Sequence, residues 1–281
     1  MRGYLNIFLK GLAMGVAEII PGISGGTVAL ILGIYYRLIK ALSEFNLGFL
    51  IRIKSGEYQN ALKQIDLYFL LTMAFGMMSS VFLLSNLIIY LLSFYPVFFK
   101  SFLSSLLFFS LFINPIKPKE INKNLFLGLV ISASIAFILY ATPSFNPSEI
   151  GLVYLFLCGC IAICALVLPG ISGSFILLLL GVYPTVVNAV SNFEIATLSV
   201  FIGGCAVGLF SSVRVIRRFY ERKEDLLLSI FFGLILFTIP IIWKQDAFEI
   251  NFPKFSESLV PILGGLLLGF MLIFVLNKSR E

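Results

Sequence analysis

Two short polar motifs interrupt hydrophobic sequence at matching positions, and they hold the residues best suited to bind a ligand. Residues 18–36 read EIIPGISGGTVALILGIYY, and residues 166–184, which follow at a constant offset of 148, read LVLPGISGSFILLLLGVYP. Pro lacks an amide donor and Gly costs backbone entropy in a helix, so neither segment continues as one smooth helix. Inside lipid, such a break is tolerated only where protein or a water-lined cavity satisfies the backbone.

The motif residues divide into helix breakers and candidate ligand-binding groups. The helix-breaking positions are Pro21, Gly22, Pro169 and Gly170. The candidate substrate-binding positions are Ser24, Gly25, Gly26, Thr27, Ser172, Gly173 and Ser174. Each Ser can cap the helix that follows it, and the glycines let a ligand approach the backbone closely. Two helix N-termini that meet near the midplane present free amides and partial positive charge, which suits an anion such as phosphate. The plainer alternative is a pair of close-packed kinks.

Glu18 lies three residues before the first break, and its counterpart in the second motif is Leu166. A charged side chain at the bilayer centre costs about 2.5–3.5 kcal/mol on insertion scales. We expect Glu18 either to cap loose amides or to be a protonatable group that binds a coupling H⁺ or cation. Tyr35 and Tyr183 also match between the motifs and are most simply interpreted as interfacial aromatic anchors.

Composition indicates an integral membrane protein. Hydrophobic residues make up 59% of the chain, charged residues 12%, and the mean hydropathy is +1.04. The net charge of +6 comes from short loops, so we expect contact with the membrane and not with nucleic acid. The chain has no His, which removes His-based catalysis and most zinc sites. The four Cys lie in apolar segments and are interpreted as packing residues, so no metal, no cofactor and no enzymatic activity are predicted.

The hydropathy pattern predicts an all-α, polytopic membrane protein built from two repeats in one membrane domain. The first repeat, 1–145, contains a broken hairpin at 4–42, a polar amphipathic segment at 44–66 and three spans. The second, 146–281, contains a broken hairpin at 151–190 and three spans. The hairpin arms are either re-entrant or fully spanning. Either way each half crosses an odd number of times, so the repeats are expected to be inverted.

Loop charges test this topology independently. With both termini on the cytoplasmic side, sixteen Lys and Arg residues fall inside and three fall outside, as the positive-inside rule predicts. The segment 44–66 is expected to form a short amphipathic helix on that surface. Arg37 and Arg214 lie at cytoplasmic ends of helices and are possible contacts for a headgroup. The spacings Gly11/Gly15, Gly204/Gly208 and Gly265/Gly269 predict close helix packing.

At PGISGGTxALxLGxY and PGISGSFxLLLLGVY the chain resembles a bacterial membrane family of polyprenyl-phosphate transporters, the PopT type, formerly a domain of unknown function. The resemblance runs over nearly the whole chain and includes the acid at Glu18. It implies a flippase that returns undecaprenyl phosphate to the cytoplasmic leaflet of the bacterial cell membrane for wall synthesis. By position, the family's motif residues map here to Glu18, Pro21, Gly22, Ser24, Gly25, Gly26 and Thr27, and to Pro169, Gly170, Ser172, Gly173 and Ser174.

Three other functions fit parts of this pattern. An ion-coupled secondary transporter of a small soluble anion could use the same broken helices, and a site sealed from lipid would favour it. An intramembrane enzyme is disfavoured because acid–base chemistry usually needs paired groups. A scaffold would not need duplicated polar breaks.

Overall fold

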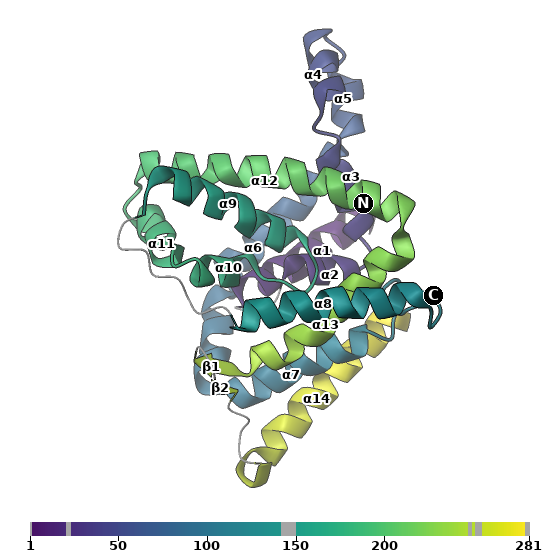
Figure 1. The fold of residues 1–281 in the computed structure, drawn as a ribbon, viewed down its shortest axis with the longest axis vertical. Coiled ribbons are helices and arrows are strands. Elements are labelled where there is room, and N and C mark those ends of the chain that lie inside the picture. The colour runs from purple at the N-terminus through teal and green to yellow at the C-terminus, as the bar shows by residue number, and fades with distance from the viewer. Residues whose placement is uncertain (1, 21–23, 142–149, 247–248, 251–254, 279–281) are drawn as a thin grey trace.

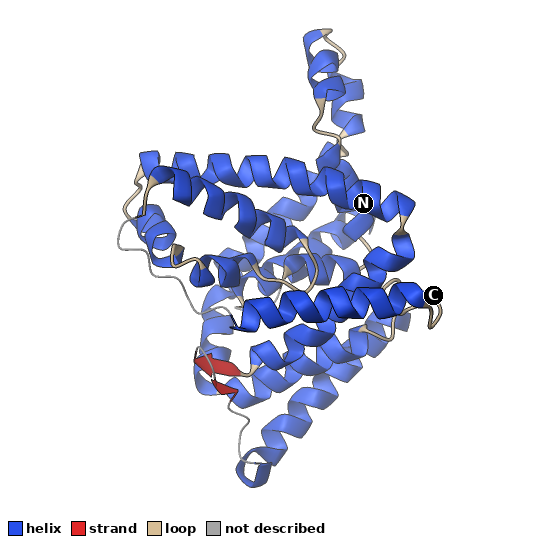
Figure 2. Ribbon diagram, in the orientation of Figure 1, coloured by secondary structure: helices blue, strands red, loops and turns tan. Residues whose placement is uncertain are grey.

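The structure, a computed structural model, describes residues 2–20, 24–141, 150–246, 249–250 and 255–278, and nearly all of them are helical (Figures 1 and 2). The first half of the chain contains α1 (Arg2–Ile19), α2 (Gly25–Ile31), α3 (Tyr35–Ser43), α4 (Leu47–Lys54), α5 (Tyr58–Gln64), α6 (Leu67–Phe94), α7 (Pro96–Ser110) and α8 (Lys123–Ala141). The second half contains α9 (Leu152–Val167), α10 (Gly173–Leu179), α11 (Tyr183–Ser191), α12 (Ile195–Arg222), α13 (Glu224–Ile242), β1 (Lys244–Asp246), β2 (Glu249–Ile250) and α14 (Phe255–Lys278).

The all-α prediction is confirmed, with one small exception: β1 and β2 pair antiparallel in the loop after α13. By length and composition, α6, α12, α13 and residues Leu259–Leu276 of α14 can each cross a membrane. The pairs α2–α3 and α10–α11 can each act as one bent span or as a re-entrant loop. The protein is therefore a multi-pass membrane protein.

The same order of elements and the same helix pairings occur in both halves. Helix α1 packs along α6, and in the second half α9 packs along α12. Helices of the two halves also pack against each other: α7 packs along α14, and α8 packs along α13. These four long contacts form the body of the molecule (Figure 1).

Glycines bring the paired helices close enough for backbone contact. A Cβ at Gly11 would collide with the Met73 carbonyl on α6, and a Cβ at Gly204 would collide with the Phe156 carbonyl on α9. Gly265 on α14 meets α7 in the same way. The predicted role of the spaced glycines in close packing is thus confirmed, since lipid provides no hydrophobic force between helices and tight contact must replace it.

Each helix after a break bends a second time, which the sequence interpretation missed. The apolar runs after the breaks were read as single arms, but α2 and α3 meet at 120°, and α10 and α11 meet at 111°. Gly33 and Gly181, at φ +70 and +68, end α2 and α10 in the left-handed conformation that only Gly adopts freely.

The segment 44–66 forms two helices, α4 and α5, and not the single short helix expected. The chain reverses at Ser55–Gly56, where Gly56 has φ +79. The resulting hairpin projects away from the body of the molecule (Figure 1).

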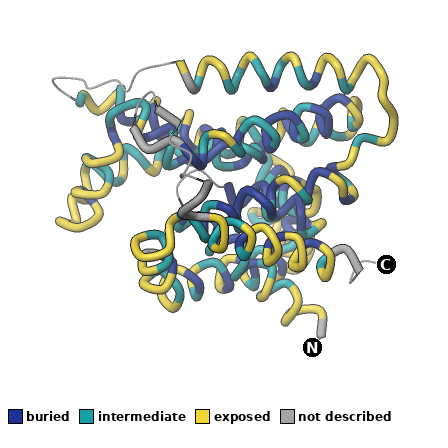
Figure 3. The backbone as a smooth tube through the Cα atoms, turned by 90° about the horizontal axis from the view of Figure 1, so that it is seen from below, coloured by how far each residue is buried: buried dark blue, intermediate teal, exposed yellow. Residues whose placement is uncertain are grey.

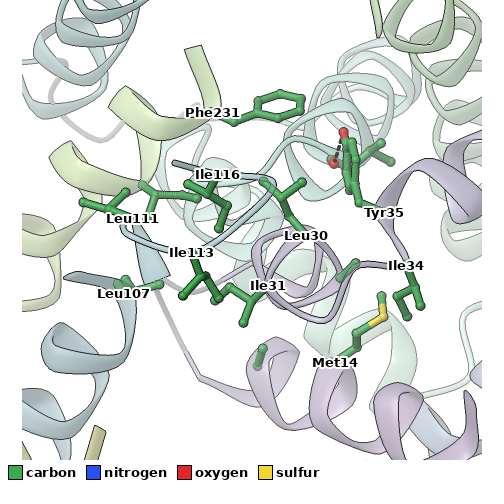
Figure 4. Close-up of a cluster of buried hydrophobic side chains, with 14 of the residues drawn as sticks. Met14, Leu30, Ile31, Ile34, Tyr35, Leu107, Leu111, Ile113, Ile116 and Phe231 are labelled. Atoms are coloured by element: carbon green, nitrogen blue, oxygen red, sulfur yellow. Dashed lines mark hydrogen bonds between the residues drawn. The ribbon is translucent and has the colours of Figure 1, made fainter. Parts of the chain in front are cut away.

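The tube in Figure 3 shows the general pattern of burial, with buried stretches inside and exposed ones along the outer helices. Buried side chains gather between α2, α3, α7 and α13, as the close-up in Figure 4 shows. Leu30, Tyr35 and Phe231 are among the least exposed residues of this cluster. The outward faces of the long helices carry many exposed apolar side chains. That distribution is expected of a protein whose outer surface faces lipid.

Two adjacent glycines on α12 provide a matched test of this packing. Gly204→Ala places a Cβ against the Phe156 carbonyl, whereas Gly203→Ala meets nothing closer than 3.7 Å. We expect Gly204→Ala to destabilise the protein by about 1–3 kcal/mol through overpacking and Gly203→Ala to leave it unchanged or more stable. Thermal unfolding of the purified variants in detergent measures both, and equal melting temperatures would contradict the α9–α12 contact.

Candidate functional site

The two breaks lie against each other, although they are far apart in the sequence. The Ser24 hydroxyl is 3.0 Å from the Leu166 carbonyl and 3.3 Å from the Leu168 carbonyl, at the end of α9. The same oxygen accepts the Gly26 amide at 3.1 Å and so caps α2. Because the last carbonyls of a helix have no partner within it, Ser24 satisfies the loose ends of two helices at once.

Thr27 and Tyr35 extend this contact between the breaks. The Gly170 amide donates to the Thr27 hydroxyl at 2.8 Å, and the Tyr35 hydroxyl donates to the Val167 carbonyl at 3.2 Å. Thr238 of α13 donates to the Gly170 carbonyl, so Gly170 is held on both sides. Polar side chains of the first half therefore supply the partners that the second break lacks, as a break within lipid requires.

Tyr35 corrects one expectation. It was interpreted as an interfacial anchor, but it is 1% exposed and packs edge-on against Phe231, with ring centres 5.3 Å apart (Figure 4). Its matched residue, Tyr183, is 38% exposed. A buried phenol needs a hydrogen-bond partner, and the free Val167 carbonyl provides one.

Gly26 allows the two breaks to approach so closely. A Cβ at this position would lie 2.9 Å from the Val167 carbonyl oxygen and 3.2 Å from that of Leu166. The positive end of α2 thus faces the negative end of α9, an arrangement that favours both helix dipoles. Any side chain larger than hydrogen would push the two ends apart.

Helix α2 is clamped at both ends by charged side chains of α1. Glu18 Oε1 accepts the Gly25 amide at 2.7 Å at the start of α2, and Lys10 Nζ donates to the Leu32 carbonyl at 2.9 Å at its end. An acid at the N-terminus and a base at the C-terminus both compensate the helix dipole. Glu18 therefore places its carboxylate at the start of α2, where the sequence analysis predicts that an anionic ligand binds.

The second break is built differently. The Ser172 and Ser174 hydroxyls bond each other at 2.9 Å, and Ser172 does not cap α10 through its side chain. Gly173 lies close to the Ala162 carbonyl of α9. At the far end of α10 the Tyr154 hydroxyl donates to the Leu180 carbonyl at 2.8 Å, in the position that Lys10 occupies in the first half. No carboxylate corresponds to Glu18, because that position is Leu166.

The remaining predicted residues are less central. Pro21 and Gly22 lie outside the described residues, and Pro169 lies in the turn after α9. Arg37 pairs with Asp66 at 2.7 Å and lies over the Phe69 ring, whereas Arg214 donates to the Phe45 carbonyl at 2.9 Å. Both Arg residues thus already have partners, Arg37 at the start of α3 and Arg214 in the last third of α12.

Sequence reasoning missed Lys10, Tyr154, Thr238 and Arg217. Lys10 lies eight positions before Glu18, a spacing of about two helical turns, and this could have suggested a shared helix face. Thr238 is a buried hydroxyl near the apolar end of α13. The four cysteines remain packing residues: Cys160, for example, donates to the Gly204 carbonyl at 3.0 Å.

Comparison with known proteins assigns the chain to a family. Residues 14–274 match the model of the VCA0040-like family, described as undecaprenyl phosphate translocase-like. The chain belongs to this family. The match covers both breaks, Glu18 and the last residues of α1.

Two named relatives align over most of their length. A polyprenyl-phosphate transporter of Vibrio cholerae serotype O1 is 37% identical over 244 residues, which cover 85% of this chain and 78% of that protein. A polyprenyl-phosphate transporter of Staphylococcus aureus is 29% identical over 253 residues, which cover 83% of each chain. No solved structure matches significantly. The family and both relatives are named for transport and not for an enzymatic reaction.

Thr27 offers a test of the contact between the breaks. Thr27→Val keeps the shape but leaves the Gly170 amide without its acceptor, whereas Thr27→Ser keeps the hydroxyl. We expect Thr27→Val to lower the free energy of unfolding by about 1–3 kcal/mol, the usual penalty of an unsatisfied buried donor. Thr27→Ser should lower the free energy of unfolding by less than Thr27→Val does. If thermal unfolding ranks the two variants the other way, the hydroxyl does not hold the second break.

Proposed function

We propose that this protein transports polyprenyl phosphate and moves undecaprenyl phosphate from the outer to the cytoplasmic leaflet of the bacterial cell membrane. One observation carries the proposal: the family match runs through both polar breaks, and these breaks contact each other inside the protein. A phosphate headgroup cannot cross lipid unless protein donors replace its water. Paired breaks with Ser, Thr and the amides at helix N-termini are suitable donors.

The proposed headgroup site lies between the starts of α2 and α10. Its groups are Ser24, Gly25, Gly26, Thr27, Ser172, Gly173 and Ser174. At the α2 end the donors are already engaged, by Glu18 on Gly25 and by Ser24 on Gly26. At the α10 end no side chain caps the helix. The phosphate therefore enters at α10 first and reaches α2 only when the Glu18 carboxylate gives up its place.

This competition gives Glu18 a coupling role. A carboxylate and a phosphate cannot both occupy the N-terminus of α2 without strong repulsion in a low dielectric. Protonation of Glu18 removes the repulsion and weakens the bond to Gly25, so uptake of H⁺ and binding of the headgroup favour each other. Leu166 occupies the equivalent position in the second half, so Glu18 has no counterpart at the start of α10.

The proposed mechanism exposes this site to each side in turn by rocking inverted halves. The inversion is supported by α3 and α11, which are equivalent elements but lie near opposite ends of α12: Tyr36 of α3 packs on Tyr220 near its end, and α11 leads into its start. In Figure 1, the ends of α12 and α14 and the start of α1 lie on one side, and α11 with the β ribbon lies on the other. The first side carries most of the basic residues and is assigned to the cytoplasm.

The cytoplasmic side is closed by a polar contact between α3 and α12. Arg217 bonds Glu44 at 2.6 Å, Ser43 at 2.9 Å and Glu221 at 2.8 Å, while the Tyr36 and Tyr220 rings lie 4.8 Å apart. The equivalent pair, α11 and α6, makes no comparable packing contact among its described residues. We infer that this conformation is closed toward the cytoplasm and more open on the opposite side.

The ion pair is suited to neutral pH. Burial raises the pKa of Glu44, but hydrogen bonds from Gln64, Arg217 and Asn46 outweigh it and bring the pKa below its ordinary value. A carboxyl with a lowered pKa in the folded state contributes stability above its unfolded pKa and loses it as the pH falls through the lowered value. The contact is therefore intact throughout the physiological range, and its opening depends on substrate and not on cytoplasmic pH.

Transport in proteoliposomes tests the function and the role of Glu18 together. Labelled undecaprenyl phosphate should change leaflets faster with the protein than without it, and a pH gradient should drive the movement. We expect Glu18→Gln, which keeps an acceptor for the Gly25 amide but cannot change charge, to remain folded and to lose the response to the gradient. Retention of the full response would exclude Glu18 as the coupling group. Uptake of inorganic phosphate in place of the lipid would instead support a transporter of small anions.

Crosslinking tests the proposed closure. In a variant without native cysteines, Tyr36→Cys and Tyr220→Cys place two thiols where the two rings now touch. A short reducible bis-thiol reagent should lock α3 onto α12 and stop transport, and reduction should restore it. The single-cysteine variants treated in the same way are the controls. Unchanged transport in the crosslinked protein would show that α3 and α12 need not separate.

A further inference from the structure

Among the described residues, the α4–α5 hairpin extends well outside the helix bundle. In Figure 1 it projects away from the bundle and crosswise to α12, which is long and apolar enough to span the membrane. A hairpin that extends crosswise from a membrane span lies along the membrane and not across it. It begins at the end of α3, beside the basic end of α12, and is therefore at the level of the proposed cytoplasmic surface.

One face of α4 is apolar and uncovered. Leu47, Leu50 and Ile51 are 77%, 54% and 63% exposed, and no residue of α4 is buried. Their spacing of three and four positions places them on one side of the helix. On α5, Tyr58 is 60% exposed and Leu62 is 38% exposed. An apolar stripe of this kind on a short helix beside a bilayer has the pattern of a helix that lies in the interface.

The charges of the hairpin suit an anionic surface. Arg52, Lys54 and Lys63 are all exposed, and Glu57 is the hairpin's only acid. Lys54 lies seven positions after Leu47 and so continues the apolar face at the end of α4, where its long side chain can reach headgroups. Each basic residue close to an anionic leaflet strengthens binding by about fivefold.

The base of the hairpin is held firmly, so its orientation is set by the protein. Glu44 accepts from Arg217 of α12 at 2.6 Å and from Gln64 of α5 at 2.9 Å. Asn46 caps α4 by accepting the Phe49 amide at 3.1 Å. The Phe45 ring packs between those of Phe49 and Phe210. A hairpin fixed in this way presents the same apolar face continuously.

We propose that the α4–α5 hairpin is a lateral membrane anchor whose apolar face, formed by Leu47, Leu50 and Ile51, inserts into the cytoplasmic leaflet while its basic residues bind anionic phospholipid headgroups. The anchor does not depend on which substrate the protein carries. Because Glu44 joins the hairpin to Arg217, the anchor also attaches the α3–α12 contact to the leaflet surface.

Site-specific fluorescence on the full-length protein tests the anchor. With the four native cysteines replaced by Ser, a single cysteine at position 51 carries an environment-sensitive dye, and Gln59→Cys on the polar side of α5 is the matched control. Vesicles contain phosphatidylcholine alone or with phosphatidylglycerol. We expect the dye at position 51 to emit at shorter wavelength, to be quenched by brominated lipid and to be shielded from iodide, with the opposite pattern at position 59. Leu50→Cys provides a second labelled site on the same face.

A triple variant, Arg52→Gln, Lys54→Gln and Lys63→Gln, tests whether the basic residues bind anionic headgroups. These changes should remove the additional lipid quenching that phosphatidylglycerol produces at position 51, and no effect of phosphatidylglycerol in the parent would overturn the preference for anionic lipid. A dye at position 51 open to iodide would mean a solvated hairpin available to a protein partner. A dye shielded from both quenchers would mean that a second copy covers it. Either result overturns the anchor.

Discussion

The structure depends on one constraint: a backbone broken inside lipid must find hydrogen-bond partners within the protein. The first break provides them for the second. Ser24, Thr27 and Tyr35 bond the loose carbonyls at the end of α9 and the amide of Gly170. These few bonds join segments more than 130 residues apart in the sequence and place the two polar breaks in contact. The close helix pairs around them, with glycine at the points of contact, hold that arrangement in place.

The hydrogen bonds at the ends of α2 differ from those at the ends of α10. Helix α2 has an acid at its start and a base at its end, so its dipole is fully compensated by Glu18 and Lys10. Helix α10 keeps only a hydroxyl from Tyr154 at its end, and Ser172 and Ser174 bond each other at its start. The two copies of the motif therefore differ: side chains cap the start of α2, whereas none caps the start of α10. In our proposal this difference allows an incoming phosphate to displace an internal carboxylate, which links binding to protonation.

Sequence alone could predict the all-helical membrane fold, the paired breaks and the glycine contacts, because each depends on local chemistry. Pro–Gly and Ser–Gly interrupt a helix in any surroundings, and glycines four apart allow close packing wherever two helices meet. The bends at Gly33 and Gly181 could not be predicted, since a single Gly within an apolar run is usually tolerated and only the surrounding helices decide that it ends one. Tyr35 was misjudged for a similar reason. Its partner, the Val167 carbonyl, becomes free only when the other half of the chain breaks nearby. The division of 44–66 into α4 and α5 follows from Gly56, and a Gly within a polar segment is a turn signal that the sequence alone contains.

The distance between lipid phosphate and protein nitrogen tests the central claim most directly. Solid-state NMR of the protein in bilayers, with ¹⁵N in glycine amides and in arginine side chains, detects ³¹P–¹⁵N couplings from bound undecaprenyl phosphate. The basic end of α12 with the start of α13, residues 214–225, contains several Arg and no Gly, whereas Gly25, Gly26 and Gly173 lie at the breaks. The account predicts coupling of the phosphate to the glycine amides at the breaks. Coupling to arginine nitrogens alone would place the headgroup at the membrane surface and contradict it.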